Sequence, residues 1–264
     1  MSTSWFWGNG EKVFSQTKKN SCPPEKVNVQ LLYAHPVHFL VEVNMQYNIR
    51  QNLLQIQEEI VPYKPNIIAV TKYFDENAII QAYQAGLRDF AESRVIEAAE
   101  KIANLPKEIR ENSNFHFIGH LQTNKVKKVV EIFDFIHSVD SIKLAEKISN
   151  EAFAIGKTQK VLVQVNNANE IQKFGFSKEQ VIRDFNEIKD LKNIEVVGLM
   201  NMAPFGASED ELKMLFSDII SIKEELEQLY NCNLKEVSMG MSQDYKIAAQ
   251  AGSTMLRLGR ILFK

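Results

Sequence analysis

The chain has little of what a disulfide framework, a metal site or a nucleic-acid partner would require. Its 264 residues include two cysteines, Cys22 and Cys232, which lie too far apart to form such a framework or a cluster of metal ligands. The five histidines contain no His-Glu-x-x-His pattern, so we expect no metal site. A formal net charge of −2 gives no electrostatic reason to bind nucleic acid or an anionic membrane, and we expect neither partner.

Long apolar runs are also missing. No run reaches the roughly 18 residues that a membrane-spanning helix needs, and the N-terminus lacks the basic-then-apolar pattern of a secretory signal. The composition, with 45% hydrophobic and 24% charged residues, is that of a globular protein. We therefore expect a soluble protein of the cytoplasm.

Residues 1–44 differ from the rest of the chain. They hold both tryptophans, but no helical or alternating pattern organises their apolar residues. Met45 begins a segment, 45–60, whose apolar residues fall on one stripe at helical spacing. We interpret 1–44 as an irregular, poorly ordered extension and 45–264 as the folded domain. The functional protein then starts at or near Met45; the alternative is that the extension is a regulatory or interaction arm.

From residue 67 onward, short apolar runs alternate with amphipathic segments. The runs are apolar on both faces and often β-branched, which is typical of strands in a buried parallel sheet. The predicted strands are 67–70, 89–91, 115–118, 135–139, 161–165, 196–200, 235–239 and 255–258. Strands that alternate with helices fit either a doubly wound sheet or a (β/α)8 barrel. Their number and even spacing favour an α/β fold with a single TIM-type barrel and an N-terminal helix.

Local signals mark several of the intervening helices. The segments 75–85 and 141–155 run into Gly86 and Gly156, which are good helix stops. Two more helices are predicted to begin after serines, and the second of these, Ser208, has the Ser-x-x-Glu form of a capping box. These helices supply the outer layer that such a barrel needs.

Lys72 ends the first of these apolar strands. In a barrel of this type, functional side chains gather at the carboxyl ends of the strands. A lysine held partly away from water there is disfavoured in its charged form, so its amine can attack an aldehyde and form an imine. The structural alternative is a lysine that extends its charge from the barrel rim into solvent.

Two loops near the C-terminus have the composition of a phosphate site. The loop 239–244 is small and hydroxyl-bearing, contains Ser242, and leads into a helix. After the last strand, Gly259 allows the backbone to approach a ligand and Arg257 offers a fixed cation. An imine-forming lysine opposite a phosphate cradle suits a phosphorylated aldehyde.

Four motifs together resemble a known family. Ala-Val-Thr-Lys at 69–72, the segments 115–125 and 251–259, and Ser-Met-Gly-Met-Ser at 238–242 are similar to the pyridoxal phosphate homeostasis proteins. That family shares its barrel with the N-terminal domain of alanine racemases. The resemblance covers about residues 45–264, and it implies that the chain binds pyridoxal 5′-phosphate (PLP) and acts in its homeostasis.

The resemblance also implies roles for individual residues. Lys72 corresponds to the lysine that holds PLP as a Schiff base. Ser242 and the backbone around Gly259 and Arg260 would hold the phosphate. Arg257 would face the pyridine nitrogen, where an arginine keeps its own protons and leaves the ring a weaker electron sink.

The chain departs from the family pattern at two positions. Ser93 stands where the family has an asparagine near the cofactor, so we expect a shorter or water-mediated contact there. In the loop 169–175, Phe174 replaces a small residue, and nothing in the sequence explains the change.

The domain content favours a carrier over an enzyme. Racemases with this barrel add a C-terminal β-domain, whereas this chain ends at Lys264, soon after its last predicted strand. Racemisation needs a proton acceptor on each face of the substrate, and we find a base on one side only. We therefore expect a non-catalytic, monomeric PLP carrier or buffer, with PLP-dependent apoenzymes as recipients.

Two alternatives have a chemical basis. The first is a PLP-dependent, racemase-like enzyme of amino acids. The second, which does not depend on the resemblance, is a Schiff-base aldolase of sugar phosphates, since such an enzyme also needs a barrel lysine opposite a phosphate site.

Overall fold

The chain divides into two compact units, Met1–Asn44 and Met45–Lys264. In the computed structural model, the described residues are 6–8, 11–13, 47–168 and 174–264. In the first unit, β1 (Phe6–Gly8) and β2 (Glu11–Val13) pair as an antiparallel ribbon, which no sequence pattern predicts. The interpretation of 1–44 as a poorly ordered extension otherwise falls outside the described residues.

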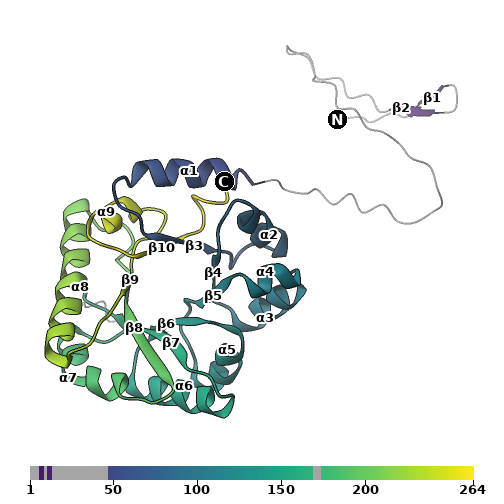
Figure 1. Cartoon of the computed structure of the whole chain (residues 1–264). Helices are drawn as coiled ribbons and strands as arrows, with labels where there is room; N and C mark the ends of the chain where they lie inside the picture. The colour runs from purple at the N-terminus through teal and green to yellow at the C-terminus, as the bar shows by residue number, and fades with distance from the viewer. Residues whose placement is uncertain (1–5, 9–10, 14–46, 169–173) are drawn as a thin grey trace. The chain divides into compact units, whose positions relative to one another are not determined.

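The second unit is a closed barrel of parallel strands. Its order is β10-β3-β4-β5-β6-β7-β8-β9 (Figure 1). The strands are β3 (Asn66–Val70), β4 (Asp89–Glu92), β5 (Asn114–Phe117), β6 (Phe135–Val139), β7 (Gln159–Val165), β8 (Ile194–Asn201), β9 (Glu236–Ser238) and β10 (Met255–Leu258). Each of them overlaps a strand predicted from the sequence, and the TIM-type barrel is confirmed.

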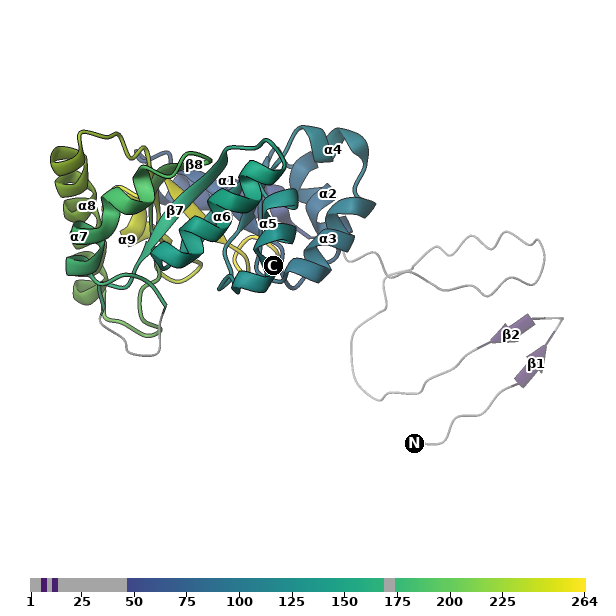
Figure 2. The ribbon, with the colours of Figure 1, turned by 90° about the horizontal axis from the view of Figure 1, so that it is seen from below.

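Helices form the outer layer, where α5 and α6 lie side by side (Figures 1 and 2). They are α1 (Ile49–Glu59), α2 (Glu76–Gln84), α3 (Val95–Asn104), α4 (Lys107–Glu111), η1 (Thr123–Lys125), α5 (Val126–Ile132), α6 (Ile142–Ala154), α7 (Lys178–Lys189), α8 (Glu209–Tyr230) and α9 (Tyr245–Gln250). Within the described ranges, none of them is both long and apolar enough to cross a membrane.

The predicted N-terminal helix closes the ring. Figure 1 shows α1 on the outside of the barrel beside β10 and β3. The Asn52 side chain donates to the carbonyl of Leu262 at 3.0 Å, and the Tyr245 hydroxyl donates to the Glu59 carboxylate. No helix follows β10 in the described residues 174–264. α1, held by the C-terminal residues and by α9, covers β10 and β3 in its place.

The predicted capping box at Ser208 is confirmed. Ser208 and Glu211 form reciprocal hydrogen bonds at the start of α8. Ser177 forms the same box with Gln180 at the start of α7, a pairing that the sequence reading did not single out. Both helices therefore begin where their side chains satisfy free backbone N–H groups.

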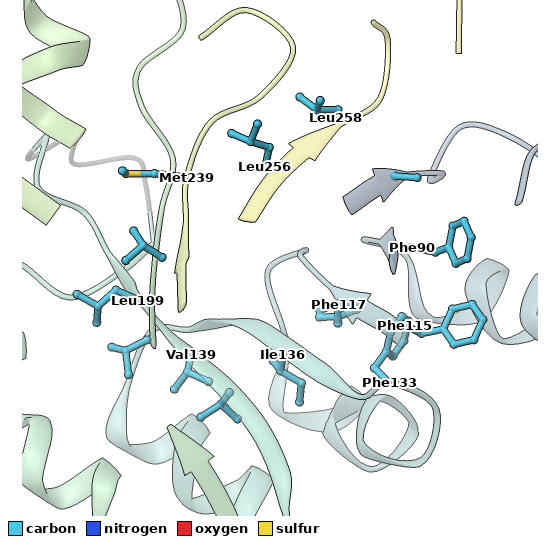
Figure 3. Close-up of a cluster of buried hydrophobic side chains, with 14 of the residues drawn as sticks. Phe90, Phe115, Phe117, Phe133, Ile136, Val139, Leu199, Met239, Leu256 and Leu258 are labelled. Atoms are coloured by element: carbon cyan, nitrogen blue, oxygen red, sulfur yellow. The ribbon is translucent and has the colours of Figure 1, made fainter. Parts of the chain in front are cut away.

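The main apolar core lies between the strands and the helices. Figure 3 shows part of it, including Phe90, Phe115 and Phe133. A second, smaller cluster fills the inside of the barrel with Ile68, Val70, Ala91 and Met255. Successive side chains of a strand point to opposite faces, so the two clusters define which residues face the barrel axis.

Candidate functional site

Lys72 lies at the mouth of the barrel. Ile68 and Val70 of β3 belong to the inner cluster, and the Thr71 N–H extends the ladder by donating to the Ala91 carbonyl at 3.0 Å. The two-residue period of a strand therefore directs Lys72 to the inner side. Its side chain is half-buried, and its Nζ lies 5.1 Å from the ring centre of the exposed Tyr73.

The opposite face of the same strand end is fixed by a buried ion pair. Thr71 Oγ1 donates to Glu92 Oε1 at 2.7 Å, and Lys101 Nζ donates to the same oxygen at 2.6 Å and to the Thr71 carbonyl at 2.8 Å. Glu92 is 1% exposed. Lys101 is thus neutralised by its partner, whereas Lys72 forms no ion pair with any described residue. The sequence reading missed this network.

Arg257 lies deeper in the barrel. Arg257 pairs with Ile68 of the adjacent strand β3, and Lys72 follows Ile68 by four residues (72 minus 68), beyond the end of that strand and nearer the mouth. Its Nη1 donates to the carbonyl and to the hydroxyl of Ser238, both at 2.6 Å, and its Nη2 donates to the Asn201 carbonyl at 2.7 Å. Burial lowers the pKa of Arg257 to about 10, while the negative charge of Asp244 acts in the opposite direction. The guanidinium therefore keeps its charge at neutral pH.

A chain of buried polar side chains crosses the barrel to reach Arg257. Asp89 Oδ1 lies 2.9 Å from His116 Nε2, and His116 Nδ1 lies 2.9 Å from His137 Nε2. His137 Nδ1 lies 3.0 Å from the Ser238 hydroxyl. His116, in the middle of β5, is thus a hydrogen-bonded core residue.

His137 and Ser238 were not singled out from the sequence. Both are fully buried. Burial, followed by the charges of His116 and Arg257, holds the pKa of His137 well below its usual value, so this imidazole is neutral at physiological pH. The available signal was a polar residue in the middle of an otherwise apolar strand, such as His137 in 135–139.

The loops after β9 and β10 meet at the rim. Ser242 is half-buried and its hydroxyl accepts from the Ile261 N–H at 3.5 Å, which joins the loop after β9 to the loop after β10. A Cβ on Gly259 would lie 3.3 Å from the Val70 carbonyl. Gly259 therefore lets this second loop approach the end of β3, two residues before Lys72. Arg260, beside it, is exposed.

The loop after β9 is held by a buried carboxylate. Asp244 Oδ1 accepts from the Met241 N–H at 2.5 Å, and Gly240 adopts a φ of +92°. A Cβ on Gly240 would lie 2.5 Å from that of Ala248, so only glycine fits the turn. Burial raises the pKa of Asp244. These contacts give the segment around Ser242 a defined shape.

Ser93 lies on the other side of Lys72, in the loop after β4. It is half-buried and lines a hollow of about 190 Å³ together with Glu97, His120 and Lys125. The backbone of Ser93 comes so near that a Cβ on Gly119 would be 2.5 Å from its carbonyl oxygen. The strand order β10-β3-β4 thus places Arg257 and Ser93 on either side of the Lys72 strand.

Phe174 contacts the same part of the rim. Its ring stacks on His120, with centroids 3.6 Å apart and planes at 13°, and His120 Nδ1 lies 3.3 Å from Asp140. The structure therefore provides the contact that the sequence left unexplained: Phe174 packs against the loop after β5.

Comparisons with known proteins agree on one family. The model of the alanine racemase N-terminal domain matches residues 46–264. A pyridoxal phosphate homeostasis protein of Synechocystis is 40% identical over 203 residues, which is 77% of this chain and 92% of the relative. The human protein of that name is 33% identical and covers 81% of this chain and 82% of its own.

Solved structures give the same result. PipY of Synechococcus elongatus, in a structure with PLP bound, is 34% identical, with a TM-score of 0.74 over 82% of this chain and 100% of that one. An alanine racemase of Clostridium difficile, at 18% identity and a TM-score of 0.66, covers 81% of this chain and 56% of its own. That second likeness concerns the barrel fold alone.

Proposed function

The chain belongs to the pyridoxal phosphate homeostasis proteins, within the family of the alanine racemase N-terminal domain, and on that premise we propose that it holds PLP on Lys72. It binds pyridoxal 5′-phosphate and acts in its homeostasis. The observation that carries the assignment of Lys72 is the convergence of its strand end with Gly259 and Ser242 at one sector of the rim.

The residues fit the three chemical parts of this cofactor. The Lys72 amine would take the aldehyde carbon. The Ser242 hydroxyl and the backbone at Gly259 and Arg260 would hold the phosphate, close to the end of β3. Arg257 uses three of its five N–H groups on described residues, which leaves two for the ring nitrogen. Ser93 would contact the ring from the β4 side.

The same geometry favours holding the cofactor over catalysis. When bound, PLP supplies an electron-withdrawing ring whose strength depends on protonation of its nitrogen. Arg257 keeps its own protons at neutral pH, so it would leave that nitrogen unprotonated. Lys72 is half-buried beside the exposed Tyr73, and Arg260 of the phosphate loop is exposed as well, so a cofactor held here could exchange with solvent.

The test is a spectrum of the purified protein with PLP, followed by borohydride reduction and peptide mapping. We expect a yellow protein whose colour is fixed by reduction on the peptide that contains Lys72. Lys72→Ala should lose the band and the adduct, whereas Lys235→Ala, which removes an exposed lysine before β9, should keep both. An adduct that maps to another lysine would refute the assignment.

We propose a monomeric carrier in the cytoplasm with PLP-dependent apoenzymes as recipients, and we expect the loaded protein to restore the activity of an added apoenzyme. Sedimentation would give the oligomeric state. Rapid loss of amino-acid chirality in the presence of the loaded protein alone would instead favour the racemase-like alternative.

A further inference from the structure

The polar chain that crosses the barrel has a defined direction. Ser238 Oγ accepts from Arg257 Nη1, so its own proton is available to His137 Nδ1 at 3.0 Å. His137 then carries its proton on Nε2 and donates to His116 Nδ1, and His116 Nε2–H donates to Asp89. In this arrangement every donor from Ser238 to His116 has an acceptor.

The opposite direction leaves a group unpaired. If His137 Nδ1 carried the proton, Ser238 Oγ would receive hydrogen bonds from both His137 and Arg257. The Ser238 proton would then have no acceptor among the described residues. An unpaired donor on a fully buried side chain is costly, so the first direction is the stable one.

The hydrogen-bonded side chains from Asp89 to Arg257 do not act as a proton relay. Arg257, whose pKa is lowered by burial to about 10, is still a far weaker acid than the carboxyl at the other end. Burial raises the pKa of Asp89, but hydrogen bonds from His116, Asn66 and Asn114 and the charge of His116 outweigh it, so the pKa of this carboxyl lies below its usual value. Passing a proton from Arg257 to Asp89 is therefore unfavourable by many powers of ten, and the charges stay fixed.

A fixed chain of this kind holds its last member in one orientation. Ser238 occupies both protons of Arg257 Nη1, and the Asn201 carbonyl occupies one of Nη2. The two N–H groups that remain, one on Nη2 and the other on Nε, are the ones available to a ligand. The hydroxyl of Ser238 is in turn oriented by His137.

We propose that Ser238 and His137 are positioning residues, which orient Arg257 toward the ring nitrogen of the cofactor. This inference rests on the proposed function, because the ring nitrogen belongs to the PLP that Lys72 holds. Neither residue is expected to touch the cofactor. Their effect passes through the guanidinium and changes both the affinity for PLP and the electronic state of its ring.

The test compares two buried serine hydroxyls. Ser238→Ala removes the hydroxyl that contacts Arg257. The matched control is Ser253→Ala. It removes a buried hydroxyl that contacts the carbonyls of Val237, Met239 and Met255 and does not belong to the hydrogen-bonded row from Asp89 to Arg257. Both variants should lose stability to a similar degree. Ser238→Ala should in addition bind PLP about tenfold more weakly, the equivalent of one hydrogen bond.

A spectroscopic readout separates orientation from stability. In Ser238→Ala, the pH at which the absorption band of bound PLP changes should move by about one unit, because the charge facing the ring nitrogen is no longer held in place. Ser253→Ala should keep the wild-type midpoint. Ser238→Thr, which retains the hydroxyl, should restore it.

The outcomes distinguish this inference from the proposed function. If Ser238→Ala and Ser253→Ala had equal PLP affinities and equal pH midpoints of the absorption change, the hydrogen-bonded side chains would only support the fold. A wild-type protein that fails to bind PLP would refute the proposed function itself. Should Ser238→Ala not fold, nitrogen NMR of the wild-type imidazoles decides: the inference requires the proton on Nε2 of both His116 and His137, and a proton on Nδ1 of His137 would overturn it.

Discussion

At the scale of single residues, the inside of this barrel carries charge where such barrels usually pack branched apolar side chains. Arg257 is 4% exposed, yet three of its N–H groups have partners on β8 and β9. Asp244 provides a compensating negative charge for Arg257, and Asp89 lies at the far end of the histidine chain. The chain of side chains from Asp89 to Ser238 is stable in this interior because each of its members has a hydrogen-bond partner.

His137 should make the protein less stable at acidic pH. Its folded-state pKa is lowered, mainly by burial, so the unfolded chain binds this proton more readily than the folded protein does. As pH falls below about 6.5, the usual value for histidine, His137 should reduce the free energy of unfolding by about 1.4 kcal/mol per pH unit. The loss continues until the folded-state pKa is reached, and urea unfolding between pH 7.5 and 5.5 measures it.

Two variants isolate this contribution. His137→Gln should be less stable at every pH but should lose this part of the slope. His120→Gln removes an imidazole whose side chain is 40% exposed, and it should leave that part of the slope in place. An unchanged slope in His137→Gln would show that another group causes the acid sensitivity.

At the scale of elements, the alternation along each strand decides which groups meet. Ile68 and Val70 share the inner side of β3, and Lys72 continues this alternation two residues after the strand ends. Thr71 faces the other way and contacts Glu92 of β4, which pairs with Lys101 of α3. The register of β10 against β3 then sets Arg257 below Lys72. A slip of β3 by one residue would turn Lys72 toward the helices. The site therefore forms only when β3 keeps its register against β10.

The second element-scale feature is the close approach of β8 and β9 at Gly198. A Cβ there would lie 1.7 Å from the carbonyl oxygen of Glu236, a backbone atom that cannot move without shifting β9. Gly198→Ala should therefore lower the free energy of unfolding by about 3 kcal/mol or more and weaken PLP binding, since β9 leads to Ser242. Chemical denaturation and a PLP titration would measure the two effects.

Gly156→Ala is the matched control. Gly156 has a φ of +67°, but nothing lies within 4 Å of the position of its Cβ. The substitution should cost about 1 kcal/mol from backbone strain alone and leave PLP affinity unchanged. Similar losses of stability in both variants would argue against a special constraint at Gly198.

At the scale of the whole molecule, α1 makes the barrel complete. Its buried residues Ile49 and Ile56 pack into the main core, and Asn52 and Glu59 bind the last residues and α9. The segments nearest the two ends of the second unit are thus in direct contact. This gives α1 the same structural role as the helices that follow the other strands.

The unit structure predicts the outcome of truncation. Because Met45–Lys264 forms a compact unit of its own, a 45–264 fragment should fold and bind PLP with the affinity of the full chain. Removing residues up to 60 should abolish folding, since it uncovers the core beneath α1. Circular dichroism and a PLP titration of the two fragments test this. Loss of binding in the 45–264 fragment would give the extension a functional role.

The sequence by itself determined the barrel and its chemistry-bearing ends. Strand and helix patterns are local, so the strands, the N-terminal helix and the cap at Ser208 could be predicted from runs of neighbouring residues. The rule that strand ends carry function then selected Lys72, Ser242 and Arg257 before any contact was known.

Only the tertiary structure decided what surrounds those residues. The chain from Asp89 through His116 and His137 to Ser238 joins four strands, and no local pattern encodes a hydrogen bond between residues 21 or 101 positions apart. No local pattern predicts the stacking of Phe174 on His120 or the close approach of Gly259 to Val70 either. Closing the barrel brings these distant residues together, because register and strand order fix which side chains share its interior.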